Sequence, residues 1–252
     1  MRGVVVVLLG VACLGVWSQA QTVDELIARN IEAKGGMEKM KALKNVRMAS
    51  KFDGGGGFTA MITQENMRPN LYRSAFSLQG MTAVQAYDGS TGWQIQPFGG
   101  HKDPELMGED GLREVLVSAD FDGPLVDYKA KGNTVEYLGH DVVDGDDALR
   151  LKTTLKNGDV LYYYLDPDTY LEIRREIEHH IRGSVRISVE ELGSYKPVNG
   201  VMFPFSVATG PKDSSDRSTV TLTKVEVNVA MDAADFALPA SLKAAQKPAG
   251  NP

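Results

Sequence analysis

Apolar and polar residues alternate through most of the chain after residue 45. Successive side chains of a β-strand point to opposite faces, so a period of two is typical of strands with one buried and one solvated face. Short turn segments rich in Gly, Asp, Asn and Pro separate the alternating runs, which favours hairpins and antiparallel pairing. The sequence therefore predicts a mainly β fold (α+β), built on one large curved antiparallel sheet that is covered by short helices.

The alternating runs give the expected positions of the strands. They predict about twelve strands, at residues 45–53, 58–66, 70–78, 82–87, 92–97, 134–143, 148–155, 160–165, 170–182, 185–195, 202–208 and 218–229.

Helical spacing occurs in three places. Thr22 is followed three residues later by Glu25, a capping-box pattern that opens a helix ending at Gly35-Gly36. A second short helix is expected over 37–43. A third is expected within 102–119, where the alternation lapses, and Pro104 is expected to open it.

The run 170–182 suggests which side chains face a core. Its charged residues fall mainly on one face, whereas Ile173 and Ile177 fall on the other. In the next strand Val185, Ile187 and Val189 are expected to point inward by the same reasoning.

Residues 1–20 have the pattern of a cleaved signal peptide. Arg2 precedes an apolar run, and Ser18 and Ala20 supply the small residues of a cleavage site. The run is shorter than the ~20 residues of a membrane-spanning helix. Cys13 offers the alternative of a lipidated cysteine, but apolar residues continue past it, so we expect export to the periplasm with cleavage near Ala20.

Composition narrows the function classes. Cys13 is the only cysteine, so the processed chain is expected to have no disulfide and no thiol nucleophile. The net charge of −6, with Lys and Arg dispersed, argues against a nucleic-acid surface. Residues 21–239 are long enough for a single domain, and the tail 240–252 is expected to be disordered.

No catalytic or metal motif stands out. His179 and His180 are neighbours in a predicted strand and so point to opposite faces, which argues against a shared metal. The acidic stretch around Asp144 lacks calcium-loop spacing and is interpreted as a hairpin turn. There is no Gly-x-Ser-x-Gly elbow. We therefore expect no enzyme activity, no cofactor and no metal.

A wide sheet is difficult to fill with three short helices, and the gap that is left is where a ligand is expected. Candidate lining residues of this apolar cavity, chosen by strand position, are Phe76, Trp93, Tyr163, Ile173 and Ile187. The alternative for such side chains is that they belong to the core.

Four segments together resemble the LolA-like superfamily, which includes the outer membrane lipoprotein-sorting proteins. They are the helix end at 33–36 with its passage into the first strand at 43–46, the turn 87–93, the hairpin 164–170, and the segment 195–204. The resemblance implies a half-open antiparallel barrel closed by helices, with an apolar cavity that takes acyl chains.

The resemblance also directs the functional hypothesis. It implies a periplasmic, non-enzymatic binder or carrier of a lipid or of the acyl chain of a lipoprotein, acting in outer membrane biogenesis. The alternative is an envelope-stress sensor or interaction module that binds a membrane protein. We expect a monomer. No motif aligns with the cavity arginine of the founding carriers, so no site residue is transferred from them.

Overall fold

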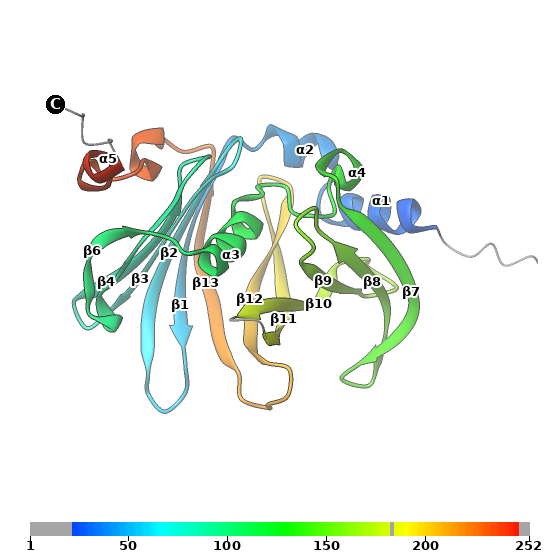
Figure 1. Ribbon diagram of the computed structural model, residues 1–252. Helices are drawn as coiled ribbons and strands as arrows, with labels where there is room; N and C mark the ends of the chain where they lie inside the picture. The colour runs from blue at the N-terminus through cyan, green and yellow to red at the C-terminus, as the bar shows by residue number, and fades with distance from the viewer. Residues whose placement is uncertain (1–21, 182–183, 247–252) are drawn as a thin grey trace, which may run out of the picture.

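The computed structural model describes residues 22–181 and 184–246, and the expected signal peptide lies outside this range. A 13-stranded sheet forms most of the molecule, in the order β6-β5-β4-β3-β2-β1-β13-β12-β11-β10-β9-β8-β7. Every neighbouring pair is antiparallel. The sheet curves without closing, so the predicted fold class, a half-open barrel with short helices, is confirmed (Figure 1).

The strands extend over the following residues: β1 Asn45–Asp53, β2 Thr59–Met67, β3 Leu71–Leu78, β4 Met81–Tyr87, β5 Gly92–Gln96, β6 His101–Leu106, β7 Thr134–Val143, β8 Asp146–Thr154, β9 Val160–Leu165, β10 Glu172–Ile181, β11 Ser184–Val198, β12 Val201–Pro211 and β13 Ser218–Val227. All twelve predicted strands correspond to one of these.

The helices are α1 Val23–Ala33, α2 Met37–Ala42, α3 Glu109–Ala119, α4 Tyr128–Lys131 and α5 Ala240–Gln246, with 3-10 turns at Pro97–Gly99 and Ala233–Phe236. Helices α1, α2 and α4 lie along one end of the barrel. Helix α3 lies between the two arms of the sheet, which are the strands β1–β6 and the strands β7–β13 (Figure 1). No helix in the described part of the chain combines the length and apolar character needed to cross a membrane.

The strand missed by the sequence is β6. Pro104 lies within it and does not open a helix, which begins only at Glu109. Because β6 is an edge strand of the sheet, a proline in it need not remove a ladder hydrogen bond. The tail also differs from expectation, because α5 occupies its first seven residues.

A bulge in β10 changes which side chains face inward. The register of β10 against β9 shifts between Glu172 and Arg174. Glu172, Arg175 and Ile177 consequently line the concave side, whereas Ile173 packs against an outer cluster that contains Tyr164. A bulge inserts one residue and so reverses the alternation on one side of it.

The next strand is also reversed from expectation. In β11 it is Glu190 and Leu192 that line the concave side, so Val185, Ile187 and Val189 face outward. The β11–β12 ladder continues past Pro211, where the backbone N of Lys212 donates to the Ile187 carbonyl at 2.9 Å. On this outer face Val185 is 54% exposed, whereas Val189 is fully buried.

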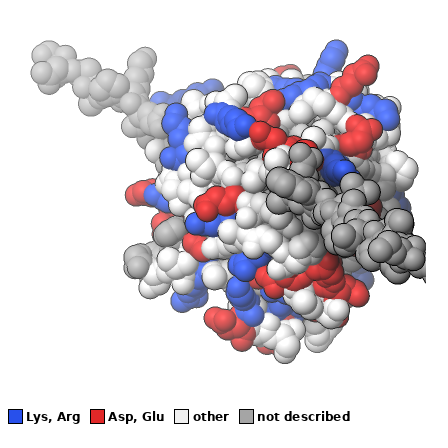
Figure 2. All heavy atoms as spheres, turned by 90° about the vertical axis from the view of Figure 1, so that its right-hand side faces the viewer, with Lys and Arg blue, Asp and Glu red and all other residues white. Residues whose placement is uncertain are grey.

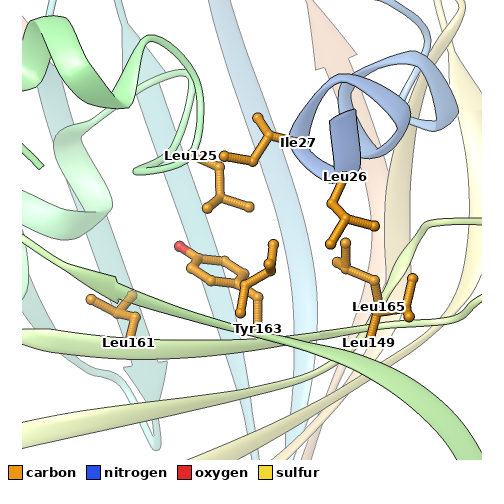
Figure 3. Close-up of a cluster of buried hydrophobic side chains, with 8 residues drawn as sticks. Leu26, Ile27, Leu125, Leu149, Leu161, Tyr163 and Leu165 are labelled. Atoms are coloured by element: carbon orange, nitrogen blue, oxygen red, sulfur yellow. The ribbon is translucent and has the colours of Figure 1, made fainter. Parts of the chain in front are cut away.

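The predicted capping box begins α1. The Thr22 backbone N donates to Glu25 Oε2 at 2.9 Å, and the Glu25 backbone N donates to Thr22 Oγ1 at 3.3 Å. Leu26 and Ile27 of this helix pack onto β8 and β9 in one buried cluster (Figure 3). Helix α1 is thereby fixed across one end of the curved sheet.

Candidate ligand-binding cavity

A cavity of about 580 Å³ lies between the concave face of the sheet and the segment 117–124. Alternate residues of the central strands form its floor, and α2 closes one end. Apolar side chains make up much of the wall, among them Met48, Ile62, Leu192, Val207, Val220 and Leu222. This size is in the range of small-molecule sites, which are also mostly apolar.

Charged side chains occupy one part of the cavity wall. Lys34 Nζ lies 3.0 Å from Glu172 Oε1, and Arg175 Nη2 lies 2.8 Å from Glu190 Oε2. Arg175 Nε is 3.8 Å from Glu172 Oε2 and makes no hydrogen bond within the described residues. The four side chains thus form a chain of alternating charge that includes two cations and two anions.

These charges keep one another ionised. Burial alone would raise the pKa of Glu172, but the charges of Lys34 and Arg175 and the Lys34 hydrogen bond hold it below its usual range. Burial opposes the charged form of Arg175 as well, yet Glu190 and Glu172 raise its pKa. A buried ion is tolerated when it is paired in this way.

Two tyrosines border the charged group. Tyr195 Oη donates to the backbone carbonyl of Glu172 at 2.7 Å. Tyr163 is 2% exposed, and its hydroxyl has no hydrogen-bond partner within the described residues. Figure 3 shows this hydroxyl pointing away from Leu26 and Leu165. Burial raises the pKa of both tyrosines, so both stay protonated donors at neutral pH.

Solved structures with the same arrangement of strands exist. A domain assigned to outer membrane lipoprotein sorting, from Vibrio parahaemolyticus, is 11% identical with a TM-score of 0.59, and the match covers 85% of this chain and 97% of that one. A LolA superfamily protein from Nitrosomonas europaea is 10% identical with a TM-score of 0.57, covering 87% and 99%. The fold is LolA-like. A DUF1329 family protein from Desulfovibrio piger also shares it, at 12% identity, a TM-score of 0.59, and coverage of 85% and 97%.

The likeness is one of structure. No known sequence family matches the chain, and no curated protein matches it in sequence. At such low identity the comparison establishes the LolA-like fold, which confirms the resemblance predicted from the sequence.

One of the five residues proposed from the sequence lines the LolA-like cavity. Tyr163 lines it. Phe76 lies farther along the concave face, in edge contact with Phe52 and Phe98. Trp93 is 6% exposed and packs with Leu238, and its indole N–H donates to the Phe236 carbonyl at 3.1 Å.

Ile173 and Ile187 are not among the cavity residues of the LolA-like fold, because both face outward. The residues that sequence reasoning missed are Glu172, Arg175 and Glu190. A signal for Arg175 was present in Arg174-Arg175-Glu176, three consecutive charges in an alternating run. Such a run cannot keep all its charges on one face of a strand.

Other candidate chemistry can be placed in the LolA-like fold. Among the described residues, no group of three or more His, Cys, Asp or Glu side chains is arranged to hold a metal ion. Asp144 and Gly145 both have positive φ and connect β7 to β8. The acidic stretch is therefore a tight hairpin turn, as predicted.

Helix α3 joins the two arms of the LolA-like barrel. On one side Val115 and Ala119 pack against Tyr72 and Tyr87. On the other side Arg113 Nη1 lies 2.7 Å from Asp159 Oδ1. A second cavity of about 380 Å³ lies beside the helix and shares part of its wall with the first.

Helix α3 makes a second contact, with strand β10, and this contact depends on pH. His179 Nδ1 lies 3.1 Å from Glu114 Oε1, and its Nε2 lies 2.8 Å from Ser188 Oγ. The Glu114 hydrogen bond raises the pKa of His179, helped by the charges of Glu114, Glu190 and Asp159 and opposed by burial. A protonated imidazole donates from both nitrogens and so satisfies both partners.

We expect stability to fall as pH rises above neutrality. The unfolded pKa of histidine is about 6.5, so the contribution of this pair is fully present below that pH and is lost as pH rises through the higher folded pKa. The loss is no more than about 1 kcal/mol. Urea unfolding at pH values from about 6 to 9 measures it, and His179→Asn should remove this part of the slope. His140→Asn is the control, because His140 is 62% exposed and its pair with Asp147 at 2.7 Å lies at the surface. An unchanged slope in His179→Asn would contradict the assignment.

Proposed function

We propose that the protein is a periplasmic, non-enzymatic binder or carrier of a lipid or of the acyl chain of a lipidated protein. The observation that carries the proposal is the largely apolar cavity of about 580 Å³ on the concave side of a LolA-like sheet. Burial of an acyl chain gains roughly 0.8 kcal/mol per methylene, so such a cavity binds a lipid without any catalytic group.

An aromatic row beyond the cavity supports the same function. Phe58, Phe52, Phe76 and Phe98 form a continuous row of edge-to-face contacts, with centroid separations of 5.8, 5.5 and 6.0 Å. Phe58 and Phe98 are 45% and 43% exposed. The row is adjacent to the cavity, since Phe52 pairs with Val220 and Phe76 with Ile62. It offers further apolar surface to a chain longer than the cavity.

Surface charge is consistent with a hydrophobic ligand rather than a polyanion. On the face that carries β7 and β8, basic and acidic side chains are interspersed outside the grey atoms (Figure 2). Several of these charges are paired, for example Lys152 with Glu136 at 3.6 Å and Arg150 with Asp141 at 3.2 Å. Nucleic-acid binding relies instead on clustered positive charge.

The test is recovery of the ligand. The protein is purified from a bacterial envelope and analysed by native mass spectrometry and lipid extraction, and the delipidated protein is titrated with a fluorescent fatty acid. We expect a bound acyl species and saturable uptake. The absence of both a bound acyl species and saturable fatty-acid uptake would contradict the proposal. Capture of a single membrane protein by a ligand-free chain would favour the sensor alternative.

Filling the cavity should abolish binding. Val207 lines the cavity, and Val207→Trp places an indole in the space of the acyl chain. We expect uptake of the fluorescent fatty acid to weaken at least about tenfold, the equivalent of about 1.4 kcal/mol. Val142→Trp is the matched control, because Val142 lies on β7 and is 66% exposed. Circular dichroism verifies that both variants fold. Equal uptake by the two variants would place the ligand elsewhere.

A further inference from the structure

Two buried donor atoms on neighbouring strands of the cavity wall make no hydrogen bond among the described residues, although carboxylates lie near one of them. Tyr163 on β9 and Arg175 on β10 are direct register partners, so their side chains emerge on the same face. The Tyr163 hydroxyl and Arg175 Nε both make no hydrogen bond within the described residues. Buried donors of this kind nearly always have a partner, and each exception calls for an explanation.

The surrounding contacts hold the donors in place. Arg175 Nη2 lies 2.8 Å from Glu190 Oε2, a charge pair in which that oxygen accepts no hydrogen bond among the described residues, and Glu172 is fixed by Lys34 at 3.0 Å. Tyr195 binds the backbone of Glu172 at 2.7 Å. Binding sites are effective when their polar groups are already positioned by such neighbours.

Charge in this part of the wall is balanced. Lys34 and Arg175 are matched by Glu172 and Glu190, and nearby Asp120 is held by Lys131 at 2.6 Å. A phosphate or a free carboxylate would therefore add an unpaired negative charge to a buried site, which is unfavourable. An uncharged acceptor oxygen meets no such penalty.

Resting on the proposed function, we propose that Tyr163 and Arg175 bind the carbonyl oxygen of an uncharged acyl ester, and that the acyl chain occupies the apolar part of the cavity. The ligand class is then a neutral acylglycerol-type lipid, in preference to a free fatty acid or a phospholipid. Acceptor oxygens of this kind satisfy both donors without disturbing the ion pairs.

The test compares ligands that differ in the charge and chemistry of their polar head group. An uncharged apolar dye, N-phenylnaphthylamine, reports occupation of the cavity and is displaced by monooleoylglycerol, oleate or lysophosphatidic acid. We expect monooleoylglycerol to bind most tightly. Tyr163→Phe should weaken monooleoylglycerol about tenfold relative to the affinity of the same variant for the dye, which has no carbonyl acceptor, as expected for the loss of one buried hydrogen bond. Arg175→Lys, which keeps the positive charge opposite Glu190, should act in the same direction.

Tyr164→Phe is the control, because Tyr164 neighbours Tyr163 in sequence but packs on the outer face. It should leave the affinity for all four compounds unchanged. Dye binding with no effect of Tyr163→Phe on monooleoylglycerol would overturn this inference and leave the proposed function intact. Tighter binding of oleate or lysophosphatidic acid would also overturn it. Absence of dye binding would instead overturn the proposed function itself.

Discussion

Replacement of Glu172 by alanine is expected to lower the free energy of unfolding by about 3–5 kcal/mol. Glu172 is 5% exposed and contacts both Lys34 and Arg175. Its removal leaves two cations with only Glu190 to balance them at the cavity wall. The desolvation of an uncompensated buried charge is the physical origin of the loss.

The measurement is equilibrium unfolding in urea, with the midpoint and the slope determined separately. Glu136→Ala is the matched control, since Glu136 is 59% exposed and pairs with Lys152 at the surface. Surface pairs of this kind contribute about 0–1 kcal/mol. Losses of similar size in the two variants would show that Glu172 does not hold the buried charges together.

Replacement of Leu26 by alanine should cost about 2–5 kcal/mol, the range for deleting a fully buried leucine. Leu26 is 0% exposed and lies in the cluster that joins α1 to β8 and β9 (Figure 3). The cost combines the lost transfer energy of the side chain with the cavity left behind. Where in this range the value falls depends on how far α1 can settle onto Leu149 and Leu165.

Leu116→Ala provides the comparison on another helix. Leu116 lies on α3 and is 39% exposed, so its truncation should change stability by less than about 0.5 kcal/mol. Thermal and urea unfolding of both variants measure the difference. A small effect of Leu26→Ala would mean that α1 is not needed for the stability of the sheet.

Local signals account for what the sequence predicted correctly. The capping box of Thr22 and Glu25 depends on contacts three residues apart, and the hairpins depend on adjacent runs and their turns. The error at Pro104 had a different origin, because the position of β6 at the sheet edge is a property of the whole sheet. An isolated segment does not indicate whether a strand has one neighbour or two.

The site was harder to predict than the fold. Tyr163 lies at the cavity wall, and a buried aromatic residue on a strand is a reasonable cavity candidate. Glu172 and Arg175 were missed because the bulge after Glu172 reverses the alternation. The alternation was the only evidence in the sequence for the face of the sheet on which a side chain lies. Ile187 shows the same limit, since apolar and polar residues alternate in β11 but Glu190 and Leu192, not Ile187, line the concave side.

The pairing of β1 with β13 has a consequence for how the chain folds. Met48 pairs with Val225 across nearly the whole sequence, whereas each of the other strand pairs of the described sheet joins consecutive strands. The two meanders β1–β6 and β7–β13 can each form from local hairpins. The central ladder between β1 and β13, which joins the two meanders, requires closure of a very long loop. Such non-local pairing is slow, because chain entropy is lost before the contacts form. The middle of the barrel therefore assembles last, and until then β1 and β13 are both open edges that another chain could pair with.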